Sequence, residues 1–127
     1  MIMADSRRRY AFNRTRQAFL ASDLQVADTH WMRLKGLIGT CVGDFDHGQG
    51  LWIVPCQGVH TMFMQFPIDV LYLDDNNVVL HTEENVRPWR LTPVRTGASS
   101  VLELPVRTLF LSGTAVGDEI EIRPVES

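Results

Sequence analysis

Short apolar runs separated by turn residues dominate the sequence and predict a β-rich domain. In the run 67–73, Ile68, Val70 and Tyr72 alternate with Asp69, Leu71 and Leu73. Alternate residues of a strand face opposite sides, so both faces of this strand are apolar except at Asp69. The pattern therefore predicts a strand that is buried on both sides. Similar runs predict further strands over residues 19–20, 24–27, 51–54, 58–64, 78–83, 100–104 and 119–122.

One N-terminal helix is predicted over residues 28–38. Asp28 or Thr29 can cap its first turn, and Trp31, Leu34 and Ile38 share one face that should dock on the sheet. Residues 106–112 are ambiguous between a strand and a short helical turn that ends at Gly113. Many short strands with one early helix indicate a mainly β fold, either a small antiparallel sandwich or a barrel.

Length and composition are those of one globular domain. The chain has 127 residues, of which 45% are hydrophobic and 21% charged. No apolar run approaches the ~18–20 residues of a membrane-spanning helix, so no membrane insertion is expected. Two cysteines are too few for a disulfide-built miniprotein, and no secretory signal is recognised, which predicts a cytoplasmic protein.

Charge is distributed unevenly along the chain. Residues 1–20 carry a net charge of +4, whereas residues 21–127 carry −7. We therefore expect residues 1–12 to be a basic arm that folding does not require, followed by a single domain over 13–127. Nucleic acid is not expected as a partner, since the body of the chain has no basic stripe.

Two carboxylates fall within otherwise apolar strands and are candidates for special roles. A buried carboxylate must be hydrogen-bonded, paired or protonated. Asp69 is interpreted either as a structural acceptor of backbone N–H groups or as a polar anchor in a ligand cleft. Glu103 raises the same question more weakly, because its strand could be exposed on the face that carries Val101 and Glu103.

Metal and catalytic motifs give little support for an enzyme. Cys56, His60 and Met64 are residue types that suit a soft metal such as Cu(I), but Met also fills cores and a lone His is usually structural. The spacing of Cys41 and Cys56 fits neither a redox pair nor a zinc knuckle, and no nucleophile elbow, P-loop or dinucleotide fingerprint occurs. No metal site and no cofactor are therefore predicted.

Three stretches resemble the uncharacterised bacterial and archaeal proteins of the DUF192 family. They are 27–39, with Arg33 and the glycines that follow it; 50–74, with its H-T-x-F-M-x-x-P-I-D-V-like segment; and 101–118, with E-L-P at Glu103. The resemblance covers residues 13–122 and implies a mostly β fold without an established activity. Many family members have glycine where this chain has Arg107, which predicts a remodelled loop after Pro105.

The favoured interpretation is a non-catalytic module that binds a ligand or serves as an accessory domain, with an unidentified small molecule or protein as its partner. The candidate site residues are His60, Thr61, Asp69, Arg87, Trp89 and Arg90. Arg87 and Arg90 can bind anions, and Trp89 offers an amphipathic contact surface. The alternatives are a hydrolase that uses Asp69 or His60 as acid or base, and a soft-metal protein that uses Cys56, His60 and Met64.

Overall fold

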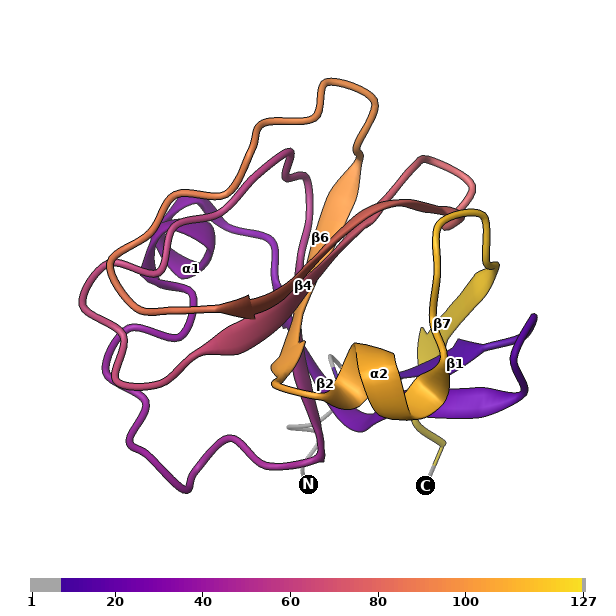
Figure 1. Cartoon of the computed structure of the whole chain (residues 1–127), viewed down its shortest axis with the longest axis horizontal. Coiled ribbons are helices and arrows are strands. Elements are labelled where there is room, and N and C mark those ends of the chain that lie inside the picture. Colours follow the sequence, from indigo (N-terminus) through magenta and orange to yellow (C-terminus); the bar gives the residue numbers. More distant parts are fainter. Residues whose placement is uncertain (1–7, 127) are drawn as a thin grey trace.

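A computed structural model describes residues 8–126 and contains one seven-stranded sheet and two short helices (Figure 1). Most strands match apolar runs of the sequence. In chain order the elements are β1 (Arg9–Asn13), β2 (Ala18–Ala27), α1 (His30–Lys35), β3 (Gly48–Ile53), β4 (Ile68–Leu73), β5 (Val79–Val86), β6 (Ser100–Pro105), α2 (Thr108–Ser112) and β7 (Ile120–Pro124).

The sheet has the strand order β5-β4-β6-β3-β2-β1-β7 and curls into a half-barrel (Figure 1). Its two ends approach each other, because Val78 forms a β-bridge with Glu119 and the Val79 nitrogen donates to the Asp118 oxygen at 2.8 Å. All neighbouring strands are antiparallel except β2 and β3, which run parallel. The mainly β prediction is confirmed, and in place of two stacked sheets the chain forms one curled sheet.

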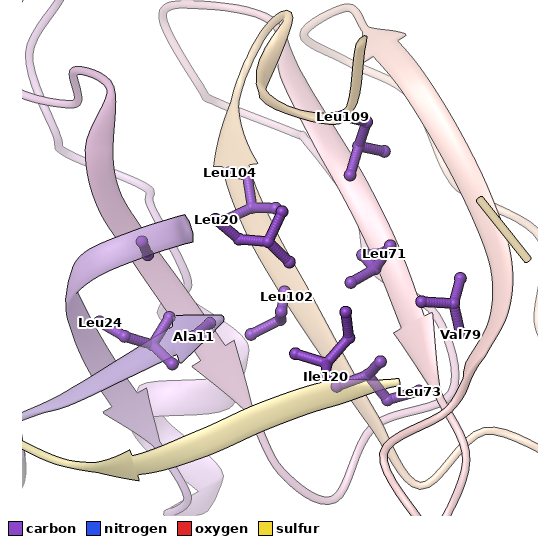
Figure 2. Packing of buried hydrophobic residues seen from close by; sticks show 11 residues of the cluster. Ala11, Leu20, Leu24, Leu71, Leu73, Val79, Leu102, Leu104, Leu109 and Ile120 are labelled. Carbon is purple, nitrogen blue, oxygen red and sulfur yellow. The ribbon is translucent and has the colours of Figure 1, made fainter. Parts of the chain in front are cut away.

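Two apolar cores lie on opposite faces of the central strands. The inner core fills the curl of the sheet and includes Leu71 and Leu73 of β4, with Leu102 and Leu104 of β6 (Figure 2). The outer core contains Ile68, Val70 and Tyr72 of β4. Strand β4 is therefore buried on both sides, as its sequence pattern predicts.

The helices differ in part from the prediction. Helix α1 is shorter than the expected 28–38: the Thr29 side chain caps its first turn, and Gly36 ends it with a φ of 51°. Trp31 and Leu34 are exposed, so the predicted apolar face of this helix is not docked on the sheet. The second helix, α2, lies within the segment 106–112, where the sequence allows a helical turn, and Figure 1 shows it below the opening of the curl.

The N-terminal segment departs from the expected arm. Residues 1–7 lie outside the described part of the chain, but Arg9–Phe12 belong to β1, which pairs with both β2 and β7. Ala11 is fully buried in the inner core, and the Tyr10 hydroxyl donates to Glu121 at 2.6 Å. The expectation that residues 9–12 lie outside the domain is therefore wrong.

The predicted strand over 58–64 does not form. In this segment only His60 makes a β-bridge, to Leu91, and Phe63 has a φ of 64° in the left-handed region. An apolar run resembles a strand in sequence, but here its backbone hydrogen bonds go to a second loop that comes from after β5. These two loops cover the outer face of the sheet beside α1 (Figure 1).

Candidate functional site

Thr61 joins the two loops that carry most of the predicted site residues. Its side chain is fully buried; the hydroxyl donates to the Arg87 oxygen at 2.6 Å and accepts from the Arg90 nitrogen at 2.9 Å. Its backbone nitrogen donates to the Arg90 oxygen, and its oxygen accepts from the Trp89 nitrogen. The structure thus brings Thr61, Arg87, Trp89 and Arg90 together through backbone contacts, with the Thr61 side chain as the connector.

Trp89 lies on the surface of these loops and contacts Phe63. The two ring centroids are 4.6 Å apart, and both side chains are more than half exposed. Both residues have positive φ angles, which cost energy for residues other than glycine. Trp89 therefore forms part of an exposed aromatic pair.

Asp69 lies apart from these residues, on the inner face of β4. Its side chain is 1% exposed, and its two oxygens accept hydrogen bonds from the backbone nitrogens of Asn85, at 3.0 Å, and Leu109, at 3.1 Å. It lines a cleft beside Arg107 and Phe110 that His60 does not reach. The geometry matches the interpretation of Asp69 as a structural acceptor.

A larger cleft opens on the outer face between α1 and the segment 55–60, and we call it the α1 cleft. Its volume is about 580 Å³. Leu34 and Leu91 lie at its sides, and Glu103 of β6 contributes a carboxyl group to its lining. Its other lining residues are His30, Arg33, Lys35, Gly36, Ile53, Pro55, Cys56, Gln57, Gly58, Val59 and His60. The space is large enough for a small organic ligand.

Glu103 is the unusual group of this cleft. Its side chain is 2% exposed, and within the described residues its Oε1 atom has no hydrogen-bond partner. A Cβ atom on Gly36 would lie 3.6 Å from that oxygen, so the end of α1 packs over the carboxyl group. Burial raises the pKa of Glu103 to about 8, because the low-dielectric surroundings disfavour the charged form. At neutral pH the group is a carboxylic acid that can both donate and accept.

Basic and imidazole groups line the cleft near α1. Arg33 donates to the Pro55 oxygen at 3.1 Å and contacts His30 Nδ1 at 3.1 Å, which ties the helix to the segment after β3. His60 Nδ1 accepts from the Met62 nitrogen at 3.2 Å, so the neutral ring carries its proton on Nε2. His60 is the predicted site residue that lines the α1 cleft.

Cys56 also lines the cleft, but its thiol is not activated. It donates to the Gly58 oxygen at 3.1 Å, and burial raises the pKa of the thiol, which reduces the thiolate that nucleophilic attack requires. Met64 belongs to the outer core rather than to the cleft lining. Residues 8–126 contain no group of three His, Cys, Asp or Glu side chains placed to hold a metal ion.

The sequence pattern identifies Glu103 as a carboxylate within an apolar strand but does not place it among the candidate site residues. Both faces of β6 are buried, so the face that carries Val101 and Glu103 is not an exposed one. The available signal is a single carboxylate among apolar residues in the run Ser100–Pro105. Its position on the outer face, away from Asp69, depends on strand pairing that the sequence pattern does not reveal.

These features define a class: a small domain built on one curled sheet, with a cleft of about 580 Å³ whose lining includes a buried carboxyl group. The chain belongs to the DUF192 family, described as "Uncharacterized ACR", whose sequence profile matches residues 11–122. The resemblance drawn from the sequence is confirmed at the level of the family. The family brings no established activity to this chain.

Sequence relatives carry the same uncharacterised status. A "UPF0127 protein" from Thermococcus sibiricus is 29% identical over 114 residues, which is 86% of this chain and 71% of the relative. Another from Thermococcus kodakarensis is 27% identical over 119 residues, or 90% of this chain and 73% of the relative. Both organisms are archaea, so these relatives do not support a specifically bacterial origin.

Solved structures show the same fold. A protein from Sinorhizobium meliloti, titled a "putative transcription regulator", superposes with a TM-score of 0.76 at 18% identity, over 90% of this chain and 91% of that one. A protein of unknown function from Novosphingobium aromaticivorans has a TM-score of 0.72 at 19% identity, over 90% and 83% of the two chains. At these identities the likeness concerns the fold alone. Among the described residues, no helix is long and apolar enough to cross a membrane.

Proposed function

We propose that this protein is a non-catalytic ligand-binding domain and that the α1 cleft holds the ligand. One observation carries the proposal: Glu103 lines an open cleft, and its buried carboxyl group has an oxygen, Oε1, with no hydrogen-bond partner among residues 8–126. An unsatisfied buried polar atom costs about 1–3 kcal/mol. A ligand that hydrogen-bonds to this oxygen would recover that free energy on binding.

The positions of Asp69 and His60, the acid and base of the hydrolase alternative, favour a binding function over hydrolysis. Asp69 uses both oxygens on backbone N–H groups and faces the inner core, whereas His60 lines a cleft on the outer face. A general acid–base pair requires both groups within reach of one substrate. The soft-metal alternative is weakened by Met64, which packs in the core.

The predicted site residues of the two loops support one side of the α1 cleft in this proposal. His60 and Leu91 form one side of the cleft and are joined by a β-bridge. We propose that Thr61 fixes this side through the segment that carries Arg87, Trp89 and Arg90, and that this segment contacts a partner. A cytoplasmic location remains part of the proposal.

Four probes with a common four-carbon chain test the proposed site: butyramide, butylammonium, butyrate and 1-butanol. Each is titrated at millimolar concentration into ¹⁵N-labelled protein, with amide chemical shifts as the readout. We expect at least one probe to shift the amides of Gly36, Cys56, His60 and Glu103. Asn85 and Leu109, beside Asp69, serve as the internal control. Shifts confined to Asn85 and Leu109, or none with any probe, would overturn the proposed site.

A further inference from the structure

Given the proposed function, we infer that the α1 cleft recognises a neutral amide-type group, which pairs with the uncharged carboxyl group of Glu103 through one donated and one accepted hydrogen bond. The ligand class is a primary amide on an apolar stem, because a trans secondary amide points its N–H away from the side of its C=O. The preference for an amide can be wrong while the α1 cleft is still a binding site.

The surroundings of Glu103 favour the uncharged form. Within residues 8–126 the carboxyl group forms no ion pair, and its Oε1 atom lacks a hydrogen bond. The pKa of about 8 results from burial alone, without a nearby charge of either sign as a cause. A carboxylic acid has an O–H donor and a C=O acceptor side by side, whereas a carboxylate only accepts.

An amide matches this pair of groups. Its C=O accepts from the acid O–H, and one N–H donates to the acid C=O, so both polar groups of the acid are paired. An alcohol can occupy both sites only by bending one hydrogen bond. A carboxylate ligand can accept a hydrogen bond from the acid O–H, but it has no donor for the carbonyl oxygen of Glu103.

The charges at the cleft disfavour a cation. Arg33 and Lys35 line it on the α1 side, so an ammonium head group would meet like charges in the cleft. It must also deprotonate the acid before an ion pair can form. A neutral head group meets neither cost, which is why we favour an amide over an amine.

Apolar side chains supply the remainder of the site. Ile53 and Val59 line the cleft, and Leu34 and Leu91 are exposed at its sides. An aliphatic stem attached to the amide would bury these surfaces, at about 25 cal/mol per Å² of apolar area. The four probes therefore share one stem length and differ in the head group.

Two variants at one position test the inference. Glu103→Gln keeps a donor and an acceptor in nearly the same shape, so we expect its butyramide affinity to stay within about threefold of the wild type. Glu103→Leu removes both groups and should weaken binding about tenfold or more, the scale of one lost hydrogen bond. The leucine side chain leaves no buried polar atom at this position, and a thermal melt of each variant verifies folding.

The pH dependence gives a second readout. For the wild type, the butyramide association constant should be level at pH 6–7 and should fall towards roughly tenfold per pH unit above pH 8, as the acid ionises. In Glu103→Gln it should not change with pH over this range. A constant that rises with pH in the wild type would contradict the inference.

The outcomes separate the two proposals. If butylammonium binds more tightly than butyramide, and Glu103→Gln abolishes binding, the cleft is a cation site; the amide inference is then wrong and the proposed binding function stands. If none of the four probes shifts the cleft amides, the proposed function itself fails. Butyramide binding that survives in Glu103→Gln and is lost in Glu103→Leu supports both.

Discussion

Asp69 in β4 accepts a hydrogen bond from the backbone nitrogen of Leu109 in α2, 3.1 Å away. It thereby caps a helix that lies far from it in the sequence. The residue at the N-cap position, Arg107, makes no side-chain cap of its own. The second oxygen of Asp69 accepts from Asn85, which has a left-handed φ of 54° in β5. One carboxylate therefore joins β4, β5 and α2.

Replacement of Asp69 should destabilise the fold. Asp69→Asn places an NH2 group against one of the two N–H donors, and Asp69→Ala leaves both donors unpaired. We expect each to lower the free energy of unfolding by about 1–3 kcal/mol, measured by urea denaturation. Asp75→Asn, at an exposed turn, is the matched control and should change little. An unchanged midpoint in both Asp69 variants would show that the carboxylate is not a structural acceptor.

Arg107 should tolerate glycine better than alanine. Its φ is 75°, in the left-handed region that favours glycine, and its guanidinium lies 4.8 Å from the centre of the Phe110 ring. Arg107→Ala loses the contact with Phe110 and keeps the backbone strain, whereas Arg107→Gly loses the contact and relieves the strain. We expect the glycine variant to be about 1 kcal/mol more stable than the alanine variant in urea melts. Equal stabilities would show that the position carries no strain.

The N-terminal strand should be required for stability. Deletion of residues 1–12 removes most of β1, which lies between β2 and β7 in the sheet. We expect a fall in melting temperature of at least several degrees, since ~1 kcal/mol corresponds to a few degrees in a domain of this size. Deletion of residues 1–7, which stops before β1, is the control and should have the smaller effect. Equal melting temperatures for both deletions would contradict a role for β1.

Elements with a clear two-residue alternation or a capping signal were predictable from the sequence. The strand over 68–73, its buried faces and the Thr29 cap all follow from local patterns. The basic N-terminal residues concealed β1, because arginines that flank a short apolar segment resemble a solvated arm. Strand β1 forms because β2 and β7 supply partners from distant parts of the chain.

The site was less predictable because it depends on pairing between distant segments. The run 58–64 resembles a strand in composition, but Thr61 bonds to the segment 87–90 instead of to a neighbouring strand. Strand register decides which face of β6 carries Glu103. It also decides that α1 lies over that face. A single sequence does not specify register between strands far apart in the chain. Thus residue type identifies His60 as a candidate and Glu103 as a carboxylate within a strand, while only the fold places Glu103 at the cleft.

The two cysteines should differ in reactivity. Cys41 is exposed, whereas Cys56 is partly buried, donates to Gly58 and has a raised thiol pKa. Because the thiolate is the reactive form, iodoacetamide at pH 7.5 should modify Cys41 well before Cys56. Mass spectrometry of the peptides gives the two rates, and denatured protein, in which both should react alike, is the control. Faster modification of Cys56 in the folded protein would mean that its thiol is activated after all.

Glu103 should make the stability of the protein depend on pH. Its pKa is about 8 when folded, against an ordinary value of 4.5, so between these pH values the folded state binds more protons than the unfolded state. The free energy of unfolding should therefore fall as the pH rises through this window, by at most about 1.4 kcal/mol per pH unit from this one group. The contribution is fully present below pH 4.5 and is lost once the pH exceeds about 8.

Glu103→Gln isolates this effect, because glutamine does not titrate while the other ionisable groups remain. Urea denaturation of both proteins at pH 5, 6, 7 and 8 gives the difference in unfolding free energy at each pH. We expect this difference to shift in favour of the variant as the pH rises, by a few kcal/mol in total, because the wild type must either keep a proton or bury a charge. A difference that stays constant from pH 5 to 8 would mean that Glu103 ionises normally in the folded protein, and the carboxyl group would then face the cleft as a carboxylate.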